Sequence, residues 1–344
     1  MSHTLAAAAS AVAQAETAVL VAEIEFLRPD AEHPFTYAHR TPTGAEPETV
    51  RFVGHAVEIR DVRGVAPLRL DAHGAILGQW PTRVRRFDDE QHVRQRYYPE
   101  SAEIIQAALG ADRVVVFDHN VRRGTALPVA EGRHDLGRPV HHAHTDYTPR
   151  SALQRLRNEL GENAEQGLSR YLQVNLWRPI RGPVRDAPLA LCDGASVAPH
   201  TLRTVELRYP DRRGEIYYLV HERAQRWYFA ADMTVDEAWL FKNFDSAPPG
   251  PAHAVPQQLP ADRACHASLS RCSGNSPPRS EWLGLGHLAT VSSAVRRTGA
   301  DVRGLSAAGA LQRRGESARD HEAHPPLYLP FRQPVSADSG DHGA

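Results

Sequence analysis

The chain has 344 residues, of which 41% are hydrophobic and 24% charged, and its formal net charge is −1. A chain of this length and composition has ample core for one large or two modest soluble domains. The near-neutral charge gives no excess of basic residues of the kind that binds nucleic acid or an acidic membrane surface. No apolar stretch approaches the ~20 residues that a membrane helix needs.

The cysteines indicate the cellular compartment of the protein, and the first residues indicate what kind of segment begins the chain. Cys192, Cys265 and Cys272 show neither CxxC pairing nor a disulfide framework, which indicates a reducing, cytoplasmic location. Residues 1–17 are Ala-rich without a basic n-region, so we expect a flexible leader rather than a signal peptide.

Strand signals dominate the chain from residue 18 to residue 246. Early strands are expected over 18–28, 50–59 and 113–118, with a helix over 87–109 that ends at Gly110. A strand bearing His144 and Asp146 follows, and after Pro149 a helix-prone insert covers 150–166. Turn residues separate the remaining predicted strands, 171–177, 189–192, 204–209, 215–220, 226–229 and 238–244. Many short strands at close spacing predict a mainly β sandwich or jelly roll with flanking helices.

The motif with the clearest chemistry is His144-Thr145-Asp146, preceded by His142. Side chains alternate along a strand, so His144 and Asp146 lie on the same side. Such a pair forms two thirds of the 2-His-1-carboxylate triad of non-haem Fe(II) oxygenases. The plain alternative is a His-rich loop that contains an Asp. His142 lies two residues before His144. It either supports the His144–Asp146 pair from outside or is simply part of a loop.

Two residues of the predicted strand 171–177 and its end are further candidates for binding a cofactor. Arg178 is able to hold a carboxylate bidentately, or to form an ordinary surface ion pair. Asn175 and Trp177 share the face opposite Leu176, where they either line a pocket or pack in the core.

Other functions also fit the central motif. His142, His144 and Asp146 follow the His-x-His-x-Asp pattern of zinc metallo-hydrolases, although Tyr147 stands where that pattern requires a second-site His. A non-catalytic β-helix binding protein is a third interpretation.

Many short segments in a fixed order carry a family resemblance. They are Tyr97–Glu100, Val116–His119, His144–Thr148, Val174–Pro179, Gly182–Val184, Pro188–Asp193, Arg226–Phe229 and Asp236–Ser246. On these, the chain resembles the hydroxylase/desaturase family of non-haem Fe(II), 2-oxoglutarate-dependent oxygenases, which includes a cephamycin-methoxylation component and fungal enzymes of natural-product pathways.

The resemblance implies a fold, cofactors and a site. The expected fold is a double-stranded β-helix (jelly roll, cupin-like) over residues 18–260. The expected activity is hydroxylation or desaturation of a small secondary-metabolite-like substrate, with Fe(II) and 2-oxoglutarate as cofactors. His144 and Asp146 then take the roles of two iron ligands.

The chain departs from the family after Ser246. The family shows an Arg-Phe-x-x-His-Thr-Ala-Phe-like stretch there, which supplies the third iron ligand and is followed by the Arg that anchors 2-oxoglutarate. In this chain residues 261–344 form a Pro/Arg/Ser-rich tail that we expect to be poorly ordered. If the tail is native, His221 is favoured over His253 as the third ligand.

A shift of reading frame after Ser246 accounts for both the tail and the missing ligand. The segment Ala254–Pro260 can be encoded so that reading one base later gives RFHSSF. Continuing through residues 261–269, the same frame can give PPTAPATPR. This hypothesis places a histidine close to where the family has one.

Overall fold

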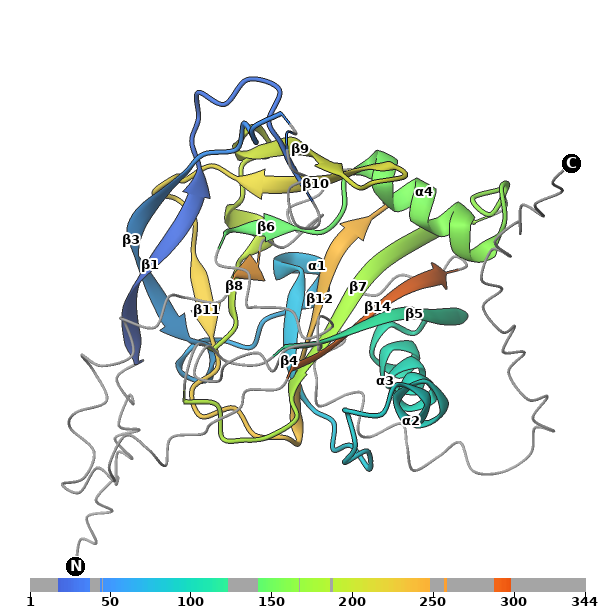
Figure 1. Ribbon diagram of the computed structural model, residues 1–344. Helices are drawn as coiled ribbons and strands as arrows, with labels where there is room; N and C mark the ends of the chain where they lie inside the picture. Colours follow the sequence, from blue (N-terminus) through green and yellow to red (C-terminus); the bar gives the residue numbers. More distant parts are fainter. Residues whose placement is uncertain are drawn as a thin grey trace, which may run out of the picture.

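The computed structural model describes residues 18–37, 44, 46–122, 142–166, 168–185 and 188–247, and the backbone of 257–258 and 288–297. Within these ranges the protein is mainly β with flanking helices (Figure 1). The strands are β1 (Val19–Leu27), β2 (Phe35–Tyr37), β3 (Phe52–Asp61), β4 (Ala75–Gln79), β5 (Arg113–Arg122), β6 (His144–Thr145), β7 (Arg170–Pro179), β8 (Ala190–Cys192), β9 (Leu202–Arg208), β10 (Arg213–Leu219), β11 (Trp227–Phe229), β12 (Glu237–Asp245), β13 (Gln257–Gln258) and β14 (Leu288–Arg297). The main helices are α1 (Leu70–His73), α2 (Glu90–His92), the π-helical η2 (Val93–Tyr97), α3 (Tyr98–Leu109) and α4 (Pro149–Leu160).

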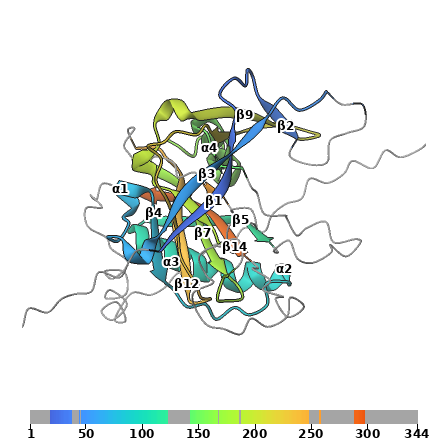
Figure 2. The same ribbon diagram turned by 90° about the vertical axis from the view of Figure 1, so that its left-hand side faces the viewer.

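The strands form two sheets. The larger has the order β1-β3-β11-β8-β13-β6-β10-β9-β2, and the smaller has the order β4-β12-β7-β14-β5. Figure 2 shows the long antiparallel pair β1 and β3 crossing the near side of the molecule. β3 then pairs in parallel with β11, which carries the sheet on toward β8.

Part of the larger sheet closes on itself. β1, β3, β11, β8, β13 and β6 pair in succession, and a parallel bridge between Glu25 and His142 joins the last strand back to the first. We call this set of six strands the strand ring. Its alternate side chains form one buried cluster that includes Ile24, Phe26, Ala143 and Trp227. Period-two alternation therefore turns the neighbours of these residues, such as His144, away from that cluster.

The outer side of the strand ring packs against the smaller sheet. Leu191 on β8 and Tyr228 on β11 share a buried cluster with Trp177 on β7 and with Trp239 and Phe241 on β12. These nonlocal contacts hold the strand ring against β7, where Asn175 reaches Asp146, 29 residues earlier in the chain.

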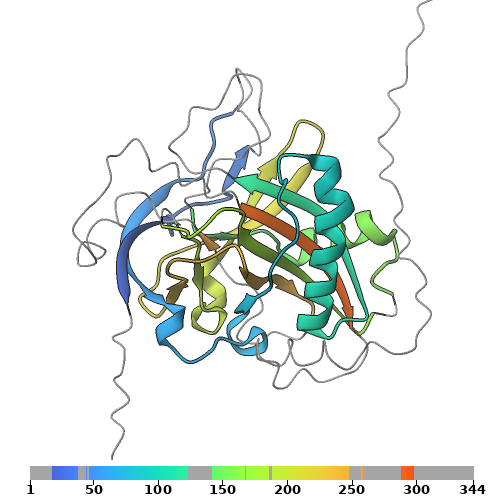
Figure 3. The same ribbon diagram turned by 90° about the horizontal axis from the view of Figure 1, so that it is seen from below.

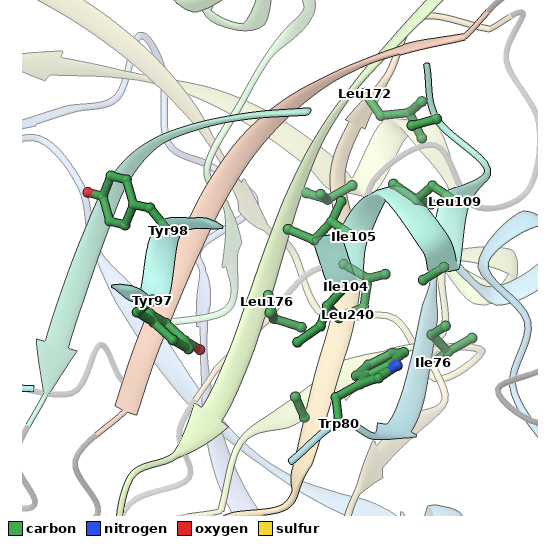
Figure 4. Close-up of a cluster of buried hydrophobic side chains, with 14 of the residues drawn as sticks. Ile76, Trp80, Tyr97, Tyr98, Ile104, Ile105, Leu109, Leu172, Leu176 and Leu240 are labelled. Atoms are coloured by element: carbon green, nitrogen blue, oxygen red, sulfur yellow. The ribbon is translucent and has the colours of Figure 1, made fainter. Parts of the chain in front are cut away.

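The other face of the smaller sheet is covered by α3 (Figure 3). The helix places Ile104, Ile105 and Leu109 against Leu172 and Leu176 of β7. Figure 4 shows these side chains in one layer with Ile76, Trp80 and Leu240. Ile105 and Leu176 are completely buried, so each contributes about 1.5–3 kcal/mol of hydrophobic stabilisation.

The main elements agree with those predicted from the sequence. The helix predicted over 87–109 is present from Glu90 to Leu109 as α2, η2 and α3. The insert predicted as helical is α4, which begins at the capping residue Thr148. The sequence missed β2, α1 and β4, which are short. It also missed β14, a ten-residue strand within the tail that was expected to be poorly ordered; residues 1–17 and the rest of 261–344 lie outside the described residues.

A buried charge cluster connects β12 to β7. Lys242 Nζ lies 2.8 Å from Asp245 Oδ2, and Arg170 Nε donates to Asp245 Oδ1 at 2.7 Å. Burial alone raises the pKa of the Asp245 carboxyl, but the hydrogen bonds from Arg170 and the charge of Lys242 outweigh burial and hold this pKa well below its usual value. The charged form is therefore the one that the fold stabilises.

We predict that Asp245→Asn lowers the free energy of unfolding at pH 7 by about 3 kcal/mol, because it leaves the buried Lys242 with only the more distant, half-exposed carboxylate of Asp71 at 3.7 Å as a counter-charge. A depressed folded pKa gives stability that is present above the unfolded pKa of about 4 and lost as the pH falls below it. Urea unfolding should therefore show the deficit of the variant shrinking from pH 7 to pH 3. Asp232→Asn, which alters an exposed pair with Arg185, is the control, and a deficit that does not change with pH would contradict this account.

Candidate active site

The predicted pair of His144 and Asp146 lies where the strand ring meets the smaller sheet. His144 belongs to β6, and Asp146 follows in the bend before α4. Nε2 of His144 lies 3.5 Å from Oδ1 of Asp146, and both side chains are partly buried. The sequence expectation that the two side chains come together is met.

The proton position on His144 is determined by a backbone group. Nδ1 of His144 lies 2.7 Å from the carbonyl oxygen of His142. A carbonyl oxygen only accepts hydrogen bonds, so Nδ1 carries the proton in the neutral ring. Nε2, the nitrogen that points to Asp146, then carries the lone pair, as a metal-ligating imidazole requires.

Asn175 holds the carboxylate from the opposite sheet. Its side-chain Nδ2 donates to Oδ2 of Asp146 at 2.9 Å, and Asn175 itself is 1% exposed on β7. The bond aligns Asp146 so that Oδ1 is the oxygen nearest to His144. Asn175 was predicted from the sequence to bind a cofactor, whereas in the structure it contacts the candidate metal-binding carboxylate.

An adjoining bond anchors β6 to the smaller sheet. The hydroxyl of Thr145, which is completely buried, donates to the backbone carbonyl of Asn243 on β12 at 3.2 Å. Asn243 lies where the β12–β7 register shifts, and such bulges commonly re-aim side chains near functional sites. The residue between His144 and Asp146 is thereby fixed on the other side of the strand.

Three residues around His142 were not predicted from the sequence. Its ring stacks on Phe52 with centroids 3.7 Å apart, and its Nδ1 lies 2.7 Å from Oε2 of Glu25. Tyr218 presents its edge to both His142 and His144. Glu25, Phe52 and Tyr218 come from three different strands, β1, β3 and β10. Only the charge of Glu25 within an apolar strand marked any of them in the sequence.

The prediction for Arg178 is corrected by the structure. Arg178 lies on the same face of β7 as Leu176, toward the helices and away from Asn175. It is completely buried, donates from Nε to the hydroxyl of Tyr97 at 2.9 Å, and donates from Nη1 to the carbonyl of Trp80 at 2.7 Å. Among the described residues its Nη2 has no hydrogen-bond partner. Alternation along the strand thus directs the guanidinium into the core beside η2 and away from the His144–Asp146 pair.

The prediction of His221 as third metal ligand is also corrected. The His221 ring stacks on His55 at 4.0 Å and contacts the edge of Phe26 at 5.1 Å. Within the described ranges, no three His, Cys, Asp or Glu side chains are grouped so that they could hold a metal. His253, the second choice, lies outside those ranges.

The similarity of this chain to known proteins identifies its family. A family model described as an oxidoreductase/YMDC permease-like domain matches residues 24–271. The Fe(II)/2-oxoglutarate-dependent dioxygenase nvfI of Aspergillus novofumigatus is 30% identical over 274 residues, which is 75% of this chain and 92% of that relative. The chain belongs to this oxidoreductase family. The hydroxylase/desaturase efuI of Hormonema carpetanum is similar too, at 28% identity over 65% of this chain and 79% of its own.

A solved structure shares the fold of this oxidoreductase. The iron and alpha-ketoglutarate-dependent endoperoxidase NvfI superposes with a TM-score of 0.67 at 22% identity, covering 81% of this chain and 98% of its own. None of the described helices is long and apolar enough to cross a membrane. The family match continues past Ser246 to residue 271, farther than the motifs indicated.

The family resemblance and the expectation of an oxidoreductase are therefore confirmed. The comparisons support neither the zinc-hydrolase interpretation nor the non-catalytic one. The geometry agrees, because the ring of His142 is held by Glu25 and Phe52; a zinc site of the hydrolase type would instead need it to converge with His144 and Asp146.

We predict that Arg178→Leu lowers the free energy of unfolding of this oxidoreductase by about 2–3 kcal/mol, because it leaves the buried polar groups of Tyr97 and Trp80 without their partner. Binding of Co(II) and 2-oxoglutarate by the folded fraction should not change. Urea unfolding and calorimetric titration measure the two properties, with the exposed Arg185→Leu as the control. If Arg178→Leu lost 2-oxoglutarate binding while its free energy of unfolding stayed unchanged, Arg178 would be a cofactor-binding residue after all.

Proposed function

We propose that this oxidoreductase hydroxylates or desaturates a small secondary-metabolite-like molecule, using Fe(II) and 2-oxoglutarate, and that His144 and Asp146 hold the iron. The observation that carries the proposal is the 3.5 Å approach of Nε2 of His144 to Oδ1 of Asp146. Family membership supports the reaction class, because relatives of this chain are named dioxygenases and hydroxylase/desaturases.

The two donor atoms suit a divalent metal. Two neighbouring ligands held about 2.1 Å from one octahedral ion lie about 3 Å apart, close to the separation found here. An imidazole nitrogen and a carboxylate oxygen are the donors of the non-haem iron triad. An iron ion held by these donors would, with 2-oxoglutarate and oxygen as co-substrates, supply the oxidising power for attack on a C–H bond.

The protein groups supply orientation and exclude water. The carbonyl of His142 keeps the proton of His144 on Nδ1, and Asn175 holds Oδ2 of Asp146. Tyr218, which is 7% exposed, packs edge-on with His144, whose side chain is 13% exposed. Shielding of the imidazole from water limits side reactions of a strong oxidant with solvent.

A third ligand is expected from the segment next to β13. The backbone of Gln257 pairs with His144 on one side and with Leu191 on the other. A histidine on this stretch would therefore lie beside the pair, and the shifted reading frame can encode one there. We propose that residues 18–260 form a double-stranded β-helix domain that completes its iron site with this segment, in a reducing compartment.

The first test of the proposed function compares the chain as written with one whose reading frame is restored after Ser246. After anaerobic loading, we expect the restored chain to retain iron and consume 2-oxoglutarate, while the written chain retains little. Iron content and succinate formation are the measurements. Failure of both chains would contradict the proposed function, whereas full activity of the written chain would contradict the frame shift alone.

Ligand variants of the active chain test the individual residues. His144→Ala and Asp146→Ala should each weaken iron binding by more than about 100-fold, since loss of an outer-sphere partner alone costs 10–100-fold. His200→Ala removes a histidine whose side chain is 72% exposed and is the control. If both His144→Ala and Asp146→Ala still bound iron as tightly as the parent chain, the iron site would have to lie elsewhere.

A further inference from the structure

The closure of the strand ring acts directly on the peptide that contacts His144. The N–H of Ala143 donates to the backbone carbonyl of Glu25 at 2.9 Å. On the other side, the carbonyl of Ala143 accepts from the N–H of Leu219 at 2.9 Å. The residue before His144 is therefore held by β1 and β10 at once.

Because the peptide is planar, the hydrogen bond of the Ala143 N–H also determines the direction of the His142 carbonyl. In a trans peptide the N–H of Ala143 and the carbonyl of His142 lie in one plane and point in opposite directions. Because β1 binds the N–H, the carbonyl is turned away from β1, and its oxygen lies 2.7 Å from Nδ1 of His144. The ring closure thus selects which imidazole nitrogen bears the proton.

The side chains on either side of this peptide reinforce the same closure. The carboxylate of Glu25 lies 2.7 Å from Nδ1 of His142. The ring of Phe52 stacks on the ring of His142, with the centroids 3.7 Å apart and the ring planes 4° apart. Glu25 therefore contacts both residues of the peptide, Ala143 through its backbone and His142 through its carboxylate. Two contacts from one residue restrain the rotation of the peptide plane.

We propose that Glu25 is a positioning residue for His144: its clamp on His142 and Ala143 fixes the carbonyl that keeps the imidazole proton on Nδ1 and leaves Nε2 facing Asp146. The metal part of this inference rests on the proposed function. The proton position does not, because it is a property of the metal-free protein.

The experiment measures the ring protonation of His144 and the affinity for Co(II). Long-range ¹H–¹⁵N spectra of the metal-free chain, with the His144 signals identified by their loss in His144→Gln, report which nitrogen bears the proton. We expect the Nδ1–H form in the native chain and a mixture with the Nε2–H form in Glu25→Ala. Co(II) titration should show affinity weakened by about tenfold, the lower end of the range for an outer-sphere partner.

Matched variants separate positioning from general destabilisation. Glu25→Gln keeps a side-chain oxygen that reaches as far as the Oε2 now 2.7 Å from Nδ1 of His142, and it should restore the native spectrum. Glu23→Ala removes an exposed carboxylate two residues earlier on the same face of β1 and should have no effect. Phe52→Leu, which removes the stacked ring, should shift the proton in the same direction as Glu25→Ala.

The outcomes distinguish this inference from the proposed function. A native Nδ1–H signal in both Glu25→Ala and Phe52→Leu, with unchanged Co(II) affinity, would overturn the positioning role. A proton shift in Glu25→Ala in a chain that takes up no Co(II) at all supports the positioning role, and it counts only against the proposed function.

Discussion

The hydrogen bond from the N–H of Ala143 to the carbonyl of Glu25 closes the strand ring, and the candidate site depends on that closure. It joins the segment of His142 to β1, and the ring then surrounds the buried cluster that contains Ile24, Phe26 and Trp227. Once Ala143 faces this cluster, alternation along the strand turns His144 outward, toward the smaller sheet. A hydrophobic core on one side of a strand thereby determines which side carries the chemistry.

The second constraint is the polar contact between the two sheets. Asn175 and Thr145 are buried, and burial of an amide or hydroxyl costs free energy unless a hydrogen bond compensates it. Asn175 bonds to Asp146 and Thr145 bonds to the backbone of Asn243, so each buried group joins the strand of the site to the smaller sheet. The aromatic cluster of Trp177, Trp239 and Phe241 holds the sheets together close by. Packing supplies the stability, and these bonds determine the direction of the carboxylate.

Local regularities made part of this site predictable. The approach of His144 to Asp146 follows from period-two alternation, and the strands around residues 171–177 and 238–244 follow from β-branched and aromatic runs between turns. The same alternation, applied to Arg178, directs it to the face of Leu176, yet its capacity to hold a carboxylate suggested a site residue. Its burial against Tyr97 depends on where η2 packs, which a single sequence does not reveal. His221 was misjudged for a similar reason, because its ring contacts with His55 and Phe26 are tertiary contacts between segments far apart in the sequence. Glu25 was not predicted at all, since its role exists only once the ring has closed.

His144 and Asp146 are proposed to form one metal-binding unit at the junction of the two sheets. Anomalous X-ray diffraction from a crystal grown with Mn(II) in place of Fe(II) tests this proposal. We expect an anomalous peak within coordination distance of Nε2 of His144 and a carboxylate oxygen of Asp146. A peak at another position, such as beside His55 and His221, with none between His144 and Asp146, would contradict it.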